Sequence, residues 1–245
     1  MNLKNKMTIL FMLTGLNVTV HAQKITVATY HKMELTKYQK VIKQSLAYGD
    51  ANTAIQAIHS ILALKEKNSN YKDSLVNLYF GSGKYNSSLL LSKELLLNKP
   101  QDEGLLELQA LSYQNLGNAV EAIKSYEKLI PVSNNFYHAY QLAYLQFSIK
   151  RLLEASKTLD VAMTMEKTAT IKKIELSFPS VQDQNKTQIV PLMAAFYNLR
   201  GLIYYDLKEN EKAKIAFETA LKIMPTFEYA QQSLNAIDMM AKTKE

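Results

Sequence analysis

The fold of this chain is decided by residues 194–227, which read AAFYNLRGLIYYDLKENEKAKIAFETALKIMPTF. Apolar residues recur through this stretch at the three- and four-residue spacing of a helix face, first before and then after the polar run near its middle. The pattern predicts two helices packed against each other. Gly201 and Ala220 allow a close approach between them, and the rings of Tyr204 and Phe217 fill the remaining space.

The same arrangement recurs upstream at a near-constant interval. In the last copy the shared positions hold Tyr197, Gly201, Tyr204, Ala213, Phe217, Ala220 and Pro225. Earlier copies occupy residues 35–68, 69–102, 103–136 and 136–169, and the first and fourth of these match loosely. Gly49, Gly83 and Gly117 recur at this same interval at the expected inter-helix turns, where a left-handed residue is favoured, and Lys150 replaces this glycine in the fourth copy.

These small and large apolar positions strongly resemble those of the tetratricopeptide repeat (TPR) family, over about 170 of the 223 residues after position 22. The resemblance implies an all-α superhelical solenoid of about five helix–turn–helix repeats. A single helical hairpin cannot bury its apolar face, whereas stacked neighbours bury it together. After Pro225, residues 228–245 supply a C-terminal capping helix and tail. An irregular helical bundle is the alternative fold.

Composition agrees with this fold class. The chain has 245 residues but only 7 Gly, 5 Pro and no Cys. An all-β sandwich or barrel needs turn residues every 8–12 positions, so this chain has too few of them. The absence of cysteine excludes disulfides, thiolate metal sites and a cysteine nucleophile.

Residues 170–193 interrupt the repeats. Ile174, Leu176 and Phe178 alternate with polar residues, as in a β-strand, and residues 188–191 could form a second strand that Pro191 restricts to an edge. We expect a β-hairpin or an extended excursion here. Three roles remain open for it: a floppy insertion without function, an additional contact surface at the rim of the solenoid, or an edge that pairs with a second chain.

Residues 1–22 have the features of a secretory signal peptide. Lys4 and Lys6 precede an apolar stretch at 7–20, and Ala22 ends a small-residue cleavage site before Gln23. The stretch is too short for a membrane span, although an uncleaved anchor is an alternative. The expected organisation is therefore a signal peptide (1–22), an N-terminal segment (23–34), four repeats (35–169), an insertion (170–193), the fifth repeat (194–227) and the capping helix with its tail (228–245).

The charge of the chain argues against a nucleic-acid partner. The net charge of +7 falls to +5 without the two lysines of residues 1–22, and the basic residues form no long run. Nucleic-acid binding is therefore not expected. The signal peptide indicates an exported protein, and we expect it to be periplasmic, with a protein or peptide partner in the cell envelope. The oligomeric state is left open.

Few residues suggest chemistry. His31, His59 and His138 are widely spaced and show no metal-binding pattern, and no nucleophile motif is present. We therefore expect no catalytic residue, no metal and no cofactor.

The resemblance instead places a binding site on the first helix of each repeat, which lines the concave groove in that family. Four aromatic residues in the fourth repeat share one helix face, and aromatic residues are enriched in interface hot spots. Packing in the core is the alternative explanation for these four. The candidate groove residues are Asn77, Phe80, Leu111, Gln114, Tyr137, Tyr140, Tyr144, Phe147, Asn198, Leu202 and Tyr205. Gln39, Lys43 and Ser74 do not match the carboxylate clamp of some family members.

The sequence thus predicts a non-enzymatic scaffold or adaptor that binds a protein or peptide in the groove of an envelope solenoid. One alternative is an accessory or carrier protein that holds a small molecule or glycan against the aromatic residues. Another is a structural oligomer joined through residues 170–193.

Overall fold

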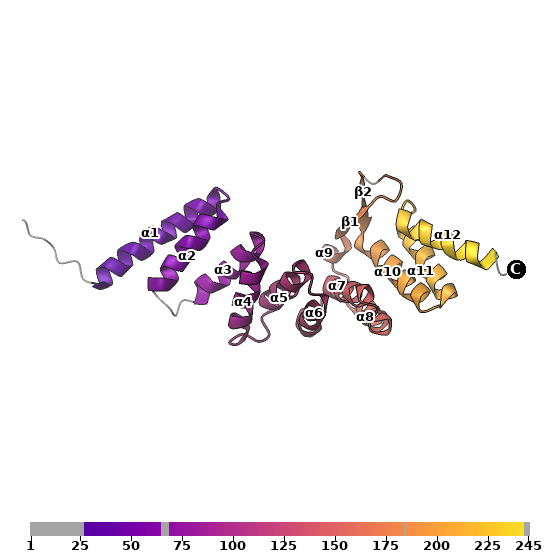
Figure 1. The fold of residues 1–245 in the computed structure, drawn as a ribbon, viewed down its shortest axis with the longest axis horizontal. Coiled ribbons are helices and arrows are strands. Elements are labelled where there is room, and N and C mark those ends of the chain that lie inside the picture. The colour runs from indigo at the N-terminus through magenta and orange to yellow at the C-terminus, as the bar shows by residue number, and fades with distance from the viewer. Residues whose placement is uncertain (1–26, 65–68, 184, 243–245) are drawn as a thin grey trace, which may run out of the picture.

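The computed structural model describes residues 27–64, 69–183 and 185–242 (Figure 1). Within these ranges the chain forms five pairs of helices, arranged one after another along the long axis of the molecule, a short helix before the last pair, and a final helix. The pairs are α1 (Val27–Ala47) with α2 (Ala51–Leu64), α3 (Ser69–Gly81) with α4 (Tyr85–Leu96), α5 (Glu103–Asn115) with α6 (Ala119–Ser133), α7 (Phe136–Ser148) with α8 (Leu152–Thr164), and α10 (Leu192–Asp206) with α11 (Asn210–Ile223). The predicted solenoid of helix–turn–helix repeats is confirmed.

The boundaries differ from the sequence expectation mainly at the first helix. Helix α1 begins at Val27 and therefore includes most of the segment 23–34, which the repeat pattern did not reach. The expected capping helix is present as α12 (Glu228–Lys242), which packs on α11. The predicted signal peptide at residues 1–22 lies outside the described residues.

All five turns within the helix pairs close in the same way. The turn residues Gly49, Gly83, Gly117, Lys150 and Lys208 are left-handed, with φ between 61° and 72°. In each turn the amide of the following residue donates to a carbonyl five residues earlier, as in Asp50 N to Ser45 O at 2.8 Å and Glu209 N to Tyr204 O at 2.9 Å. This is the hydrogen bond of a Schellman motif, in which glycine is the preferred left-handed residue.

Lys208 is strained by this conformation, because a side chain crowds the backbone at positive φ. We expect Lys208→Gly to raise the free energy of unfolding by roughly 0.5–1 kcal/mol, since the relief of strain exceeds the extra entropy that glycine has in the unfolded chain. Urea denaturation followed by circular dichroism measures the change. Gly117→Ala should have the opposite sign, and a destabilised Lys208→Gly variant would contradict this explanation.

Side-chain caps begin several helices where the sequence supplies them. Asp102 accepts from the Leu105 amide at 3.0 Å, Asn118 from Glu121 at 3.2 Å, and Asn135 from Tyr137 at 2.8 Å. Each of these contacts satisfies a backbone donor that the first helical turn leaves open.

Each helix pair packs through the small residues that the repeat predicts. One equivalent position of the second helix is fully buried in every repeat, where it holds Ala54, Ser88, Ala122, Ala155 and Ala213. In the last pair Gly201 lies against Phe217, and a Cβ added to Gly201 would lie 2.5 Å from the Phe217 ring. The small residues of the repeat pattern therefore mark the positions where the two helices of a pair approach each other closely.

The insertion is an ordered β-hairpin preceded by the short helix α9 (Ala169–Lys172). Strand β1 (Glu175–Pro179) pairs antiparallel with β2 (Thr187–Pro191), with Leu176 opposite Val190. Val190 is fully buried, and Leu176 and Phe178 pack against the core that α7 to α12 share. Because one face of the hairpin belongs to this core, the hairpin forms part of the fold and is not a floppy insertion.

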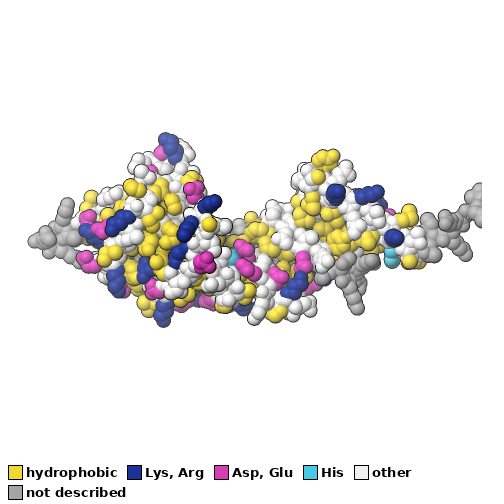
Figure 2. All heavy atoms as spheres, turned by 180° about the vertical axis from the view of Figure 1, so that it is seen from behind, with side chains coloured by type: hydrophobic (Ala, Val, Ile, Leu, Met, Phe, Trp, Pro, Cys, Tyr) yellow, Lys and Arg dark blue, Asp and Glu magenta, His cyan; other side chains and the backbone are white. Residues whose placement is uncertain are grey.

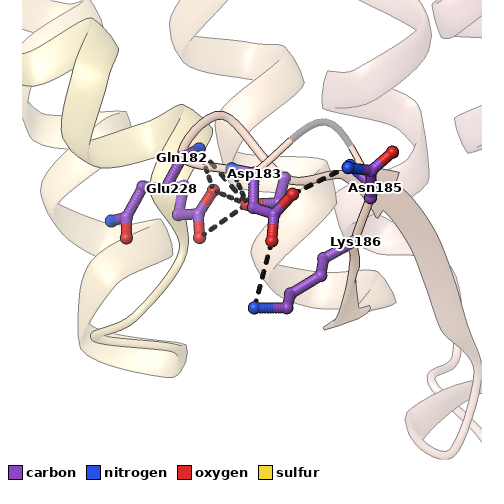
Figure 3. Close-up of polar contacts among 6 residues, drawn as sticks. Gln182, Asp183, Asn185, Lys186 and Glu228 are labelled. Atoms are coloured by element: carbon purple, nitrogen blue, oxygen red, sulfur yellow. Dashed lines mark hydrogen bonds and ion pairs between the residues drawn. The ribbon is translucent and has the colours of Figure 1, made fainter.

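The loop of the hairpin also holds the start of α12 (Figure 3). The Glu228 carboxylate accepts hydrogen bonds from the Ser180 hydroxyl at 2.9 Å and from the Val181 amide at 2.6 Å. In return, the Gln188 side chain accepts from the Glu228 amide at 3.1 Å. The Phe178 ring lies 5.2 Å from that of Phe227, so polar and aromatic contacts together connect the insertion to the capping helix.

The outer edges of the hairpin are poorly suited to pairing with another strand. In an antiparallel ladder, opposed residues alternate between pairs that are hydrogen-bonded to each other and pairs that are not. The hydrogen bond from Ser180 N to Lys186 O shows which pairs of this hairpin are the bonded ones. Pro179 and Pro191 therefore stand in non-bonded pairs, at positions where a backbone amide would point outward to a neighbouring strand. Proline has no amide hydrogen to donate there. The structure therefore gives little support to edge pairing with a second chain.

These contacts make the stability of the α12 end depend on pH. Hydrogen bonds from Ser180, and then from the Val181 and Gln182 amides, hold the pKa of Glu228 below its ordinary value. A lowered folded-state pKa stabilises the protein above the unfolded-state value of about 4.3, and this stabilisation is lost as the pH falls through the folded-state pKa. We expect Glu228→Gln to flatten the dependence of the melting temperature on pH in that window. Glu166→Gln, at an exposed site, is the matched control, and an equal flattening there would contradict this assignment.

Candidate functional site

The candidate binding surface is the first-helix face, which we define as the outward side chains of α3, α5, α7 and α10. The structure places the predicted residues on it at different depths. Tyr144 is the most available aromatic residue, with 48% of its surface exposed, and Asn77 is also exposed. The half-buried members are Phe80, Leu111, Gln114, Tyr137, Phe147, Leu202 and Tyr205.

Two predicted groove residues are buried instead. Tyr140 is 5% exposed and packs in the core with Phe136, and Asn198 is 4% exposed. Burial raises the pKa of the Tyr140 phenol, since the charged form would lose its water. Of the four aromatic residues of α7, Tyr140 therefore packs in the core, which was the alternative explanation, whereas Tyr144 lies on the surface as predicted.

A chain of hydrogen bonds fixes the polar groups between α5 and α7. The Tyr126 hydroxyl donates to Gln114 at 3.2 Å, and the Gln114 amide donates to Gln141 at 3.5 Å. The Gln141 amide donates in turn to the Tyr137 hydroxyl at 2.6 Å. Because both amides are held by neighbours, this part of the face is preorganised before any partner arrives.

Two acidic residues on the face are paired with lysines of the protein. Asp73 accepts from Lys99 at 2.8 Å, and Asp206 accepts from Lys150 at 2.7 Å. The Lys150 ammonium also lies 5.2 Å from the centre of the Phe147 ring. These ion pairs balance part of the charge on the first-helix face, where Tyr144 is the most exposed of the predicted aromatic residues.

Sequence reasoning missed one polar cluster at the α5–α7 junction. The His138 ring is 4% exposed, with Nε2 3.4 Å from Glu107 and Nδ1 2.9 Å from the Ser133 hydroxyl. If Nε2 donates to Glu107, Nδ1 accepts from Ser133, and the hydrogen bond holds the pKa of the Glu107 carboxyl below its ordinary value. Ser133, His138 and Glu107 follow the order of a catalytic triad, but the imidazole is too deeply buried to reach a substrate. We interpret the cluster as a structural one, in which Ser133 and Glu107 provide hydrogen-bond partners for the two ring nitrogens of a buried histidine.

Hollows lie on the other side of the solenoid, beside the second helices. One of about 700 Å³ is bounded by α4, α5 and α6, with Leu96, Leu106 and Tyr113 among its lining residues. Smaller ones of about 250 and 260 Å³ lie beside α8 and α11. The first-helix face and these hollows therefore offer two surfaces of different shape.

The part of the chain that the structure describes contains no cluster of three or more residues suited to a metal ion. Within the same ranges, none of the helices is both long and apolar enough to span a bilayer.

Repeat, turn and stacking together define a class of protein, the TPR solenoid. The family model described as tetratricopeptide repeat matches residues 194–227, which is the copy that first showed the pattern. Known structures extend the likeness over most of the chain, and one of those to which it is similar, YrrB, is itself described as a TPR protein.

YrrB, a TPR protein with an unusual peptide-binding site, is 15% identical, with a TM-score of 0.61 over 86% of this chain and 97% of its own. MamA from AMB-1 is 14% identical, with a TM-score of 0.60 over 80% of this chain and 94% of its own. MamA from Desulfovibrio magneticus RS-1 is 9% identical, with a TM-score of 0.57 over 80% and 97% of the two chains. No curated protein matches the sequence. At such identities the likeness concerns the fold.

Proposed function

We propose that this protein is a non-catalytic scaffold that binds a protein or an extended peptide on its first-helix face, in the cell envelope. The observation that carries the proposal is the half-exposed Tyr144 within a preorganised, partly charge-paired face. A rigid platform loses little conformational entropy on binding, and an exposed ring adds a large contact area. The peptide-binding site of YrrB, on a similar fold, supports the same class of function.

The location rests on residues 1–22, which have the features of an export signal. We infer that the mature protein begins at Gln23. Cell fractionation followed by intact mass measurement tests this directly, since the mass of a cleaved protein would correspond to residues 23–245. A full-length chain in the cytoplasmic fraction would contradict the envelope assignment and leave the binding proposal untouched.

Site-specific photocrosslinking tests the binding face. A photoreactive amino acid at Leu111, Tyr144 or Leu202 should crosslink a partner in cells. The same group at Val161, an exposed residue of α8, serves as the matched control. Crosslinks that form equally well from Val161, or only from there, would move the site to the second-helix side.

A small-molecule or glycan carrier is the second candidate, and the hollow of about 700 Å³ beside α4 and α6 favours it. Native mass spectrometry of the gently purified protein separates the two functions. A copurifying small ligand that Leu97→Trp, at an exposed residue of the hollow, displaces would support the carrier, whereas protein crosslinks from Tyr144 support the scaffold.

A further inference from the structure

The N-terminal end of the solenoid carries a surface that the proposed partner site does not use. Helix α1 packs on α2 along one side, where Ser45 is buried and Ile42 joins the neighbouring core. Its opposite side remains open. Near its start Tyr30 and Met33 are 53% and 58% exposed on or beside this open side, and Val27, on the same side as Ser45, is 72% exposed at the end of the helix.

The same helix is strongly basic. Lys32, Lys37, Lys40 and Lys43 are all exposed, and Glu34 is the single acidic residue of the helix. Figure 2 shows lysine side chains beside a hydrophobic area at the end of the molecule that α1 and α2 form. At about 100° per residue, the four lysines and Met33 fall on the arc of α1 that faces away from α2, and Tyr30 lies at the edge of this arc.

Lysines elsewhere in the solenoid are often neutralised, as in Lys99 with Asp73, Lys150 with Asp206 and Lys214 with Asp238. On α1, Glu34 pairs with Lys37 at 3.3 Å. Among the described residues, no carboxylate lies within ion-pair distance of Lys32, Lys40 or Lys43. The outer side of α1 therefore keeps a net positive charge of about three beside its apolar residues.

A shallow groove runs along this side of the helix. Its volume is about 610 Å³, and Met33 and Val41 lie in it between Lys32, Lys37 and Lys40. A flat anionic surface with an apolar interior complements this arrangement. Lysine stems can extend along apolar material while their ammonium groups remain among phosphates, and tyrosine is favoured at such boundaries.

We propose that the outer side of α1 binds the surface of an anionic phospholipid bilayer. The four lysines contact headgroup phosphates, and Tyr30 and Met33 enter the headgroup region. Four basic residues on one exposed helix face are enough for such attraction, and each lysine near an anionic surface strengthens binding roughly fivefold. The solenoid would then be held beside a membrane with its first-helix face still available.

Vesicle cosedimentation of the full chain tests this proposal. Vesicles of phosphatidylcholine with phosphatidylglycerol should bind the protein, whereas pure phosphatidylcholine vesicles should bind it much more weakly. We expect Lys32→Gln with Lys40→Gln to weaken partitioning by roughly 25-fold, which is two such steps. Added salt should also release the wild-type protein, because it screens the attraction.

The matched control is Lys128→Gln with Lys222→Gln, which removes the same charge from exposed sites on α6 and α11. This control should bind like the wild type. Equal loss in both double variants would show that net charge alone drives binding. Equal binding to both kinds of vesicle would show that the apolar stretch at 7–20 is responsible, and either result overturns the proposal. If the α1 variant instead changes the sedimentation mass of the protein alone, this face joins two copies of the chain, and the proposal is also wrong.

Discussion

We expect Gly201→Ala to lower the free energy of unfolding by about 1–3 kcal/mol, which is the usual cost of placing extra atoms in a tightly packed core. The result should be counterintuitive for a helix interior, where alanine is favoured over glycine by about 1 kcal/mol. The physical reason is the Phe217 ring, since the new Cβ would lie 2.5 Å from one of its carbons. Urea denaturation monitored by circular dichroism measures the change.

Two further variants separate crowding from a general effect of the substitution. Gly81 lies at the end of α3 with an ordinary φ and nothing within 4 Å of the position that an added Cβ would take, so Gly81→Ala should be neutral or stabilising. Phe217→Leu combined with Gly201→Ala should recover part of the loss, because the leucine side chain leaves room for the methyl group. Identical effects at Gly81 and Gly201, or no coupling between 201 and 217, would show that ring contact does not explain the choice of glycine.

The repeat itself could be read from the sequence because its determinants are local. Gly49, Gly83 and Gly117 mark turns with a left-handed backbone, and the residue at the turn itself must be able to adopt that conformation. Lys150 and Lys208 adopt the same conformation without the glycine, so composition alone underestimates the regularity of the turns. The packing of the helices holds these two lysines in the left-handed conformation. Such packing involves many residues, so the amino acid at the turn position alone does not reveal it.

How deeply each residue of the first-helix face is buried could not be predicted from the sequence in this way. Tyr140 and Tyr144 are separated by one turn of the helix, and their directions around its axis differ by only about 40°. Their environments differ because Tyr140 packs with residues of the α10 repeat, whereas Tyr144 does not join that core. The rotation between successive repeats decides this difference, and a periodicity within one helix carries no information about it.

Contacts across long sequence separations were also beyond sequence reasoning. Glu228 meets Ser180 across 48 residues, and His138 meets Glu107 across 31. The alternating pattern did predict the strands of the insertion, because alternation is local. Its attachment to α12 depends on where the hairpin folds back, and only the assembled structure shows that.

The second large effect is a contrast between Tyr140→Ala and Tyr144→Ala. Removing the buried Tyr140 ring should lower the free energy of unfolding by about 3–5 kcal/mol, as for other large aromatic residues in cores. Tyr144→Ala should change it by no more than about 0.5 kcal/mol, because nearly half of that side chain already contacts solvent. Parallel urea titrations of the two variants make the comparison independent of the absolute stability.

Binding should reverse the order of these two residues. Once crosslinking has identified a partner peptide, Tyr144→Ala should weaken its affinity about 30-fold, the loss of one hot-spot residue worth about 2 kcal/mol. Tyr140→Phe keeps the buried ring and should bind within about twofold of wild type, since a 5% exposed residue offers a partner little contact area. If Tyr144→Ala instead unfolds the protein, all four aromatic residues of α7 serve the core. If it folds and still binds normally, the partner uses another surface, because no other aromatic residue of α7 is comparably exposed.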